Sequence, residues 1–179
     1  EEIHYIFASR AADAGLQFEI RPPAALEQQL IGDGRRVGQI LINLLGNAIK
    51  FTQKGAVSLE VAFDSSREWI HFRVTDQGIG MTPEAVERLF QPFEQADQSI
   101  SGRFGGTGLG LHISQTLAEL MKGTIRVESE EGKGSTFELR VPCQFSEKPA
   151  GEIIGRDRAS TRSGSFSGHV LVAEDTPEL

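Results

Sequence analysis

Four stretches of alternating apolar and polar residues constrain the fold most, because they occur as two separate pairs. AVSLEVAF (56–63) and WIHFRVT (69–75) are joined by DSSRE, and GTIRVES (123–129) and STFELRV (135–141) are joined by EEGKG. Alternation with a period of two predicts half-buried strands, and each short polar connection predicts a hairpin. Because predicted helices separate the hairpins, we expect an α+β fold with a mixed, mostly antiparallel sheet that helices cover on one face.

Helices are predicted before and between these hairpins. Residues 1–14 have helical spacing, and LQFEI (16–20) alternates as a further strand before two prolines interrupt it. A long amphipathic helix is predicted from Asp33, the expected N-cap, to about Phe51. Shorter helices are expected at about 83–91 and after residue 110. The apolar face of the long helix should consist of Val37, Ile40, Leu41, Leu44, Leu45 and Ala48.

Composition bounds the domain organisation. With 179 residues, 39% of them hydrophobic, the chain can form one well-buried domain with some additional residues. Residues 146–168 are rich in Ser, Gly and charge and cannot build a core, so they predict a flexible linker before HVLVAED (169–175) begins a new apolar strand. We expect the main domain at residues 16–145, with residues 1–15 as the tail of an upstream helix or a connector.

Charge, cysteine content and hydropathy argue against several functions. A formal net charge of −7 disfavours broad binding to nucleic acid or to an anionic membrane. The single cysteine, Cys143, permits no internal disulfide, which fits a reducing cytoplasm. No apolar run reaches about 18 residues and the sequence does not start with a charged and then apolar stretch, so we expect neither a membrane span nor an export signal. We expect a cytoplasmic chain without direct membrane contact, and a fragment of a larger protein because it does not begin at a methionine.

GGTGLGL (105–111) is the first candidate for a binding site. Four glycines lead into a predicted helix, an arrangement in which backbone N–H groups can approach a phosphate. The stretch lacks the Lys-Ser/Thr pair of a P-loop, and no G-x-G-x-x-G spacing follows a clear strand. A different kind of phosphate site is therefore needed.

Polar residues on the long helix supply a second candidate. Asn43, Asn47 and Lys50 lie at i, i+4 and i+7, on a stripe that borders the apolar face. Amide oxygens can ligate a hard cation such as Mg²⁺, and an ammonium group can bind phosphate oxygens. A solvated polar face is the alternative, and the stripe taken alone favours it.

DQGIGM (76–81) lies directly at the end of a predicted strand. Its two glycines allow a sharp turn that brings the Asp76 carboxylate against a flat ligand, where it can accept a hydrogen bond from an amine such as adenine N6. An ordinary turn at a strand end is an equally good explanation. In RLFQPFEQAD (88–97), Phe90 and Phe93 are better explained by core packing than by ligand contact.

In combination, these segments resemble the motifs of sensor histidine kinases. NLLGNAIKFT (43–52) is similar to the N box, DQGIGM to the first glycine box, RLFQPF to the F box, and GGTGLGL with GKGSTF (132–137) to the later glycine boxes. The resemblance covers roughly residues 16–142, in the order of the family. It implies membership of the ATP-binding superfamily that these kinases share with type II topoisomerases, mismatch-repair ATPases and a heat-shock chaperone.

The resemblance implies a two-layer α/β sandwich, the Bergerat fold, with about three helices on one face of the sheet and a flexible ATP lid at about residues 82–105. It further implies that Asn47 ligates Mg²⁺, that Asn43 and Lys50 lie at the ATP phosphates, and that Asp76 reads the adenine amine. Additional residues expected at the nucleotide are Phe51, Gly78, Gly80, Gly106, Thr107, Gly108, Leu109, Gly110 and Thr136.

One position distinguishes kinases from hydrolases in that superfamily. Hydrolysing members carry a Glu four residues before the Mg²⁺-binding Asn, where this chain has Asn43, whose neutral amide cannot act as a general base. The resemblance therefore implies transfer of the γ-phosphoryl group to a histidine on a separate hairpin rather than fast hydrolysis. The Glu-x-x-Thr-Pro pattern of that acceptor follows none of the four histidines, His4, His71, His112 and His169.

The chain departs from the family before the lid glycines. Where the family commonly has Thr-Arg, this chain has Ser101-Gly102, which leaves Arg103 as the guanidinium that can stabilise transferring charge. We expect catalytic roles for Asn43, Lys50 and Arg103, although a lid surface charge explains Arg103 equally well. A non-catalytic module that binds nucleotide or a partner protein is the alternative function.

HVLVAEDTPEL (169–179) resembles the first strand of a response-regulator receiver domain, in which paired acids such as Glu174 and Asp175 help bind Mg²⁺. This implies a hybrid histidine kinase in a two-component phosphorelay. The expected partners are the dimerisation hairpin and receiver domain of the parent kinase and a downstream response regulator, with no nucleic acid. Because the dimerising part lies outside the chain, we expect this fragment to be monomeric.

Overall fold

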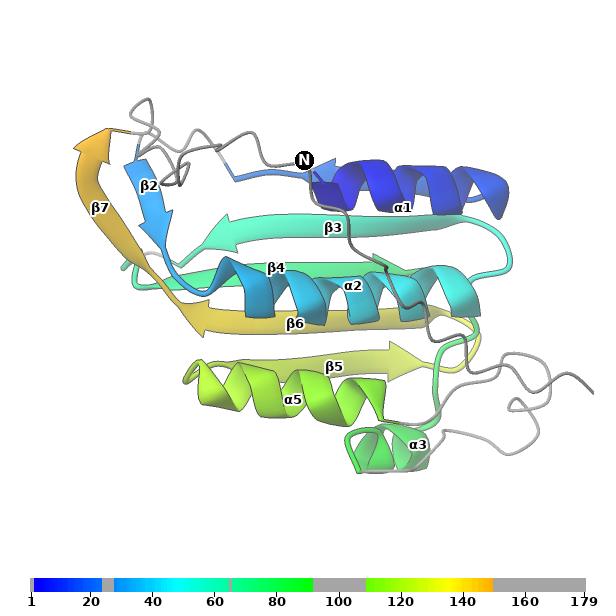
Figure 1. Ribbon diagram of the computed structural model, residues 1–179. Coiled ribbons are helices and arrows are strands. Elements are labelled where there is room, and N and C mark those ends of the chain that lie inside the picture. The colour runs from blue at the N-terminus through cyan, green and yellow to red at the C-terminus, as the bar shows by residue number, and fades with distance from the viewer. Residues whose placement is uncertain (1, 24–27, 65, 92–108, 150–179) are drawn as a thin grey trace, which may run out of the picture.

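The computed structural model describes residues 2–23, 28–64, 66–91 and 109–149. Within them, a layer of helices packs on one face of a sheet (Figure 1). The strands of this sheet are β1 (Gln17–Arg21), β3 (Ala56–Phe63), β4 (Trp69–Asp76), β5 (Thr124–Glu130) and β6 (Gly134–Pro142). The helices of the described residues are α1 (Glu2–Asp13), α2 (Gly34–Phe51), α3 (Pro83–Arg88) and α5 (Gly110–Leu120).

The main sheet has five strands in the order β1-β3-β4-β6-β5. Strands β1 and β3 are parallel, and every other neighbouring pair is antiparallel. The two predicted hairpins are present as β3–β4 and β5–β6, and they lie side by side because β4 pairs with β6. The mixed, mostly antiparallel sheet expected from the alternating stretches is therefore confirmed.

Helix α2 forms as its sequence predicts. The carboxylate of Asp33 accepts a 3.0 Å hydrogen bond from the backbone N–H of Arg36, which satisfies one of the unpaired donors at the helix start. At the other end, the Thr52 hydroxyl donates to the carbonyl oxygen of Ala48 at 2.7 Å. The predicted apolar face is confirmed, since Val37 is partly buried and the remaining members are buried, namely Ile40, Leu41, Leu44, Leu45 and Ala48.

The hydrophobic core lies between this helix face and the sheet. Alternate residues of the central strands point into it, among them Val57 and Leu59 from β3 and Val74 from β4. Leu44 of α2 is 1% exposed, and burying such a side chain contributes about 1.5–3 kcal/mol. The core thus holds the two layers together and sets the position of α2 over β4.

Helix α1, which lies in the part expected to be the tail of an upstream helix or a connector, packs against the same core. Phe7 and Ala11 are both 0% exposed and pack with the residues of α2 and the sheet. The helix lies beside β1 and α2 (Figure 1). Its few large apolar residues form only a narrow stripe, so the spacing alone did not show that the helix is packed.

A second sheet was not predicted. β2 (Gln28–Ile31) pairs with β7 (Gln144–Pro149) in an antiparallel ribbon, in which Leu30 lies opposite Phe145. The domain boundary expected at residue 145 therefore falls inside β7, which extends into the predicted linker. The sequence of β2, QQLI, is short and does not alternate between polar and apolar residues. Its pairing with β7, which lies at the other end of the domain in sequence, also leaves no local signal. The rest of the predicted linker and the predicted receiver start lie outside the described residues.

Helix α3 ends at Arg88, three residues before the expected end at 91, and Thr82 caps it by accepting a hydrogen bond from the N–H of Ala85. It lies in the segment that the resemblance assigns to the lid, of which the part from residue 92 onward is outside the described residues. Among the described residues, no helix combines the length and apolar character that a membrane-spanning segment needs.

Candidate functional site

Most of the predicted site residues that the structure describes come together at one end of the molecule. This end is formed by the end of α2, the beginning of α5, the end of β4 and the turn that follows it (right-hand side of Figure 1). The polar stripe of α2 borders the buried face there, and Asn43, Asn47 and Lys50 are all half-buried. The stripe therefore borders the core, as its spacing predicted, and is only partly exposed to solvent.

Asn43 connects α2 to α5. Its Nδ2 donates a 2.9 Å hydrogen bond to the hydroxyl of Ser114, which is 2% exposed. Its Oδ1 lies 2.5 Å from the point where a Cβ atom on Gly110 would stand. The side chain of Asn43 is therefore enclosed by α5 on two sides.

Asp76 is the last residue of β4 and is buried, with 6% of its surface exposed. Its carboxylate accepts hydrogen bonds from the backbone N–H of Gly78, at 2.8 Å, and from the backbone of Ser135. Burial nevertheless raises the pKa of Asp76 above its ordinary value of 3.8, because removal from water disfavours the charged form more than these two bonds favour it. A buried carboxylate with remaining acceptor capacity suits recognition of an amine.

Gly78 and Gly80, which are expected at the nucleotide, lie where other backbone segments approach closely. A Cβ atom on Gly78 would lie 2.5 Å from the carbonyl oxygen of Phe51, and one on Gly80 would overlap the carbonyl of Glu130. Gly80 also has a φ of +65°, which favours glycine. The Ile79 N–H donates to the Phe51 carbonyl at 3.2 Å, so the turn after β4 is held between the end of α2 and the β5–β6 connection.

Thr136 is a residue that the resemblance implies at the nucleotide. Its hydroxyl is 3.2 Å from that of Thr75, on the face of the sheet away from the helices. Ser135, one residue earlier, is buried opposite Asp76 on the helix-covered face. Because side chains of a strand alternate between faces, Ser135 and Thr136 lie on opposite sides of the sheet. Ser135, which was not among the predicted residues, is the one that lies opposite Asp76.

The remaining predicted residues divide into two groups. Lys50 and Phe51 form the last turn of α2, and the Lys50 ammonium lies 4.8 Å from the centre of the Phe51 ring. Leu109 is the N-cap of α5 without a side-chain cap, so the first N–H groups of α5 receive no bond from its side chain. Four predicted residues lie outside the described part, namely Arg103, Gly106, Thr107 and Gly108.

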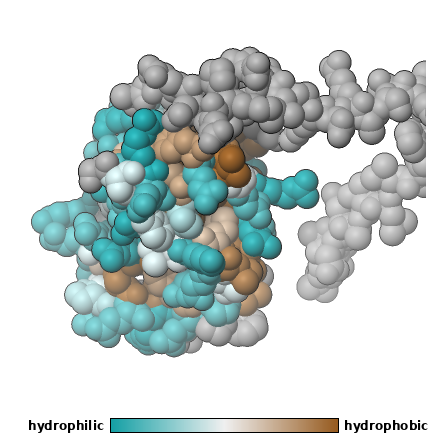
Figure 2. Space-filling model, turned by 90° about the vertical axis from the view of Figure 1, so that its left-hand side faces the viewer, coloured by the Kyte–Doolittle hydropathy of each residue, from teal (hydrophilic) through white to brown (hydrophobic). Residues whose placement is uncertain are grey.

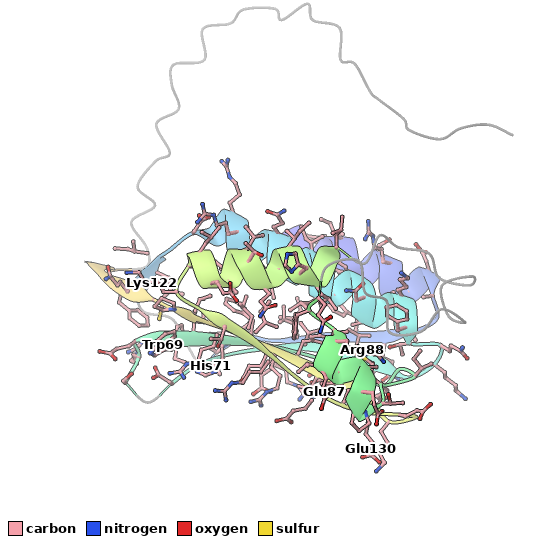
Figure 3. The ribbon with its side chains drawn as sticks, turned by 90° about the horizontal axis from the view of Figure 1, so that it is seen from below. Trp69, His71, Glu87, Arg88, Lys122 and Glu130 are labelled. Atoms are coloured by element: carbon pink, nitrogen blue, oxygen red, sulfur yellow. The ribbon has the colours of Figure 1, made fainter. Side chains whose placement is uncertain are left out.

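The histidines of the described residues have protein partners. His71 lies on the helix-free side of the sheet (Figure 3), with its Nδ1 3.4 Å from Glu138. The Nδ1 atom of His112 lies 3.1 Å from the Phe90 carbonyl oxygen. Both rings are therefore held by contacts within the domain. His169 lies outside the described residues.

The donor and acceptor set of this end fits a purine nucleotide. It combines a buried carboxylate at Asp76, half-buried amides and an ammonium on α2, and N–H groups at the start of α5 that lack a side-chain cap. Within the described ranges, no cluster of three or more His, Cys, Asp and Glu residues could hold a metal ion.

An apolar groove lies at the opposite end of the molecule, where α2 begins and α5 ends. Leu30, Ile31 and Leu120 line it, and none of the candidate site residues does. Figure 2 looks onto this end and shows apolar surface between hydrophilic side chains. The groove is therefore separate from the candidate site.

Comparison with known sequences identifies the family. Residues 32–144, more than half of the chain, match the family described as "Histidine kinase-, DNA gyrase B-, and HSP90-like ATPase". The chain is 42% identical over 141 residues to the aerobic respiration control sensor protein ArcB of Escherichia coli (strain K12). This match covers 78% of the chain but 18% of ArcB, so the chain spans less than a fifth of that relative.

Comparison with solved structures supports the same conclusion. Full-length ShkA, solved in complex with AMPPNP, is 32% identical with a TM-score of 0.71, over 81% of this chain and 29% of that one. The catalytic domain of histidine kinase ThkA is 25% identical with a TM-score of 0.65, over 79% of this chain and 89% of that one. The chain therefore belongs to the family of histidine kinase-, DNA gyrase B- and HSP90-like ATPases, and it matches histidine kinase catalytic domains in both sequence and fold.

Proposed function

We propose that this domain binds ATP with Mg²⁺ and transfers the γ-phosphoryl group to a histidine on the dimerisation hairpin of a parent hybrid kinase. The observation that carries the proposal is the buried carboxylate of Asp76, which lies at the same end of the molecule as the polar stripe of α2. ShkA, a related structure, was solved with the ATP analogue AMPPNP. The family to which the chain belongs consists of ATPase-like domains.

In this proposal, Asp76 selects adenine by accepting a hydrogen bond from its exocyclic amine. Lys50 and the N–H groups at the beginning of α5 bind phosphate oxygens, and the amide oxygen of Asn47 would hold Mg²⁺. Bound Mg²⁺ supplies positive charge that offsets the charge of the phosphates. The expected contacts of Phe51, Leu109 and the undescribed glycines with the nucleotide belong to the same proposal.

Asn43 determines what happens to the γ-phosphoryl group. Its amide donates to Ser114 and cannot accept a proton from water, so no general base is available at this position. In-line transfer then depends on an external nucleophile, and a hairpin histidine is the acceptor that we propose. Arg103 is our candidate for stabilising the transferring charge, although it lies outside the described residues.

The same proposal extends to the compartment, the oligomeric state and the partners of the domain. We infer a cytoplasmic, monomeric domain that works in a two-component phosphorelay with the parent's receiver domain and a downstream response regulator. Residues 169–179, which resemble the beginning of a receiver domain, are the part of the sequence that supports this setting.

A transfer assay tests the proposal. The chain is mixed with the purified hairpin segment of the parent, ATP labelled at the γ-phosphate, and Mg²⁺, with the Asp76→Ala variant as a control. Label on the hairpin histidine, lost with the variant, is the expected result. Steady release of phosphate by the chain alone would instead identify an autonomous ATPase.

A second candidate is a regulatory module that binds nucleotide but does not transfer phosphate. Gly102, in the place of the arginine that the family commonly has, favours it. Binding of ATP without label on the hairpin is the result that selects this candidate. If the Gly102→Arg variant then labels the hairpin, the missing guanidinium is the reason.

A further inference from the structure

We propose that Ser114 is a positioning residue that orients Asn43 toward the nucleotide phosphates, and that position 110 is glycine because the Asn43 amide occupies the space of a side chain there. This inference rests on the proposed function, since it concerns the same site. Ser114 lies outside the motifs that carry the resemblance. Gly110 lies within them and was expected at the nucleotide, whereas here it makes room for Asn43.

The contact between Asn43 and Ser114 is buried and joins two elements. Nδ2 of Asn43 and Oγ of Ser114 are 2.9 Å apart, and the hydroxyl lies on the face of α5 that packs toward α2. Ser114 is 2% exposed, so its hydroxyl depends on protein partners rather than on water. Loss of a hydrogen bond in such a place removes a constraint that solvent does not replace.

Gly110 encloses the amide from a second direction. A Cβ atom on this glycine would lie 2.5 Å from Oδ1, 3.2 Å from Cγ and 3.3 Å from Nδ2 of Asn43. The whole amide group therefore lies across the first residue of α5. Gly110 has no positive φ that would require glycine, so its absent side chain is explained by this contact.

These two contacts orient Asn43 at the place where α2 and α5 meet. The amide has one contact to each of two residues on α5, and its freedom to rotate about the side-chain bonds is removed before a ligand arrives. A group held in its binding geometry loses less conformational entropy on binding. Ser114 should therefore raise the affinity for phosphate-bearing ligands, while adenine recognition at Asp76 should not depend on it.

A double-mutant cycle measures this role. Affinities for ATP and for adenosine are determined by titration calorimetry for the chain and for the Ser114→Ala, Asn43→Ala and doubly substituted variants. We expect Ser114→Ala to weaken ATP binding roughly 2- to 10-fold, the range for one lost hydrogen bond, and to leave adenosine binding unchanged. We expect no further effect of Ser114→Ala once Asn43 is alanine.

Gly110→Ala provides a second, independent measurement. Its methyl group displaces the Asn43 amide, so ATP affinity should fall, and the Asn43→Ala substitution should relieve the clash and make Gly110→Ala neutral. Thr116→Ala on the exposed face of α5 is the matched control, since the Thr116 hydroxyl donates to the His112 carbonyl of its own helix. This control should bind ATP like the unsubstituted chain.

The outcomes separate this inference from the proposed function. If the unsubstituted chain binds neither ATP nor adenosine, the proposed function fails. If it binds both, but Ser114→Ala weakens them equally or still acts when Asn43 is alanine, then Ser114 stabilises the fold without orienting Asn43. That result overturns the positioning role and leaves the proposed function intact.

Discussion

The backbone N–H of Gly78 donates a 2.8 Å hydrogen bond to Oδ1 of Asp76, so the end of β4 and the turn after it form one structural unit. The same glycine packs against the Phe51 carbonyl at the end of α2. The Asp76 carboxylate is therefore held by the turn, which itself packs against the end of α2.

Substitution Gly78→Ala should destabilise the domain. The added methyl group would lie 2.5 Å from the Phe51 oxygen and 2.8 Å from Oδ1 of Asp76, so the backbone must shift. We expect the free energy of unfolding to fall by about 1–3 kcal/mol, as for other overpacked sites. Urea unfolding followed by circular dichroism measures the change.

Gly38→Ala is the matched control for that substitution. A Cβ atom at Gly38 meets nothing within 4 Å, and the residue lies inside α2. Since alanine favours a helix interior over glycine, this variant should gain roughly 0.5–1 kcal/mol. Equal effects of the two variants would contradict the packing that we describe at Gly78.

Adenosine binding should weaken as the pH is lowered toward the raised pKa of Asp76. Protonation removes the acceptor that the proposed contact with the adenine amine requires, and burial makes this occur above the ordinary value of 3.8. Titration of adenosine between neutral and mildly acidic pH measures the effect. The Asp76→Asn variant, which has no carboxylate to titrate, should lack this pH dependence.

The stability of the free domain should follow the opposite trend. Because the pKa of Asp76 is higher in the folded than in the unfolded chain, its contribution to stability is fully present below 3.8 and is lost as the pH rises through the raised value. Asp76→Asn should flatten this part of the stability profile, measured by urea unfolding at several pH values. An unchanged profile would argue against the raised pKa.

Bulky substitutions at neighbouring positions of β6 should differ in their effect on binding. A leucine at position 135 would stand on the helix-covered face beside Asp76, and a leucine at position 136 would stand on the opposite face beside Thr75. We expect Ser135→Leu to lower adenosine affinity more than tenfold, roughly 1.4 kcal/mol or more, and Thr136→Leu to have little effect. Calorimetric titration of both variants, after circular dichroism shows them folded, decides which face binds.

Two substitutions on α2, one at a buried and one at an exposed residue, should differ in how much they lower the free energy of unfolding. Leu44 is 1% exposed and Ile42 is 46% exposed, although they are two residues apart on one helix. Leu44→Ala should cost about 2–5 kcal/mol of unfolding free energy, and Ile42→Ala less than about 1 kcal/mol. Thermal or urea unfolding measures both, and similar losses would contradict the packing of α2 on the sheet.

Asn47→Ala should reduce the affinity for ATP only when Mg²⁺ is present. Loss of one metal ligand is expected to weaken binding about tenfold, or about 1.4 kcal/mol. In a chelating buffer, the variant and the unsubstituted chain should bind ATP equally. A loss of the same size with and without Mg²⁺ would show that Asn47 acts on the nucleotide directly.

The sequence by itself determined the elements whose signals are local. Alternation with period two located both hairpins, and the Asp33 cap with an apolar stripe located α2, because residues close in the chain decide these structures. The same local patterns placed Asp76 at a strand end and the polar stripe of α2 beside the core. The fold class could therefore be predicted, and so could the elements that carry the proposed site residues.

Only the tertiary structure decided which distant groups meet. It pairs β2 with β7, buries Phe7 of α1 in the shared core, and brings Asn43 to Ser114 across 71 positions of sequence. It also turns Ser135 rather than Thr136 toward Asp76. These arrangements depend on contacts between residues far apart in the chain and on the register of paired strands, and no local pattern in the sequence records either.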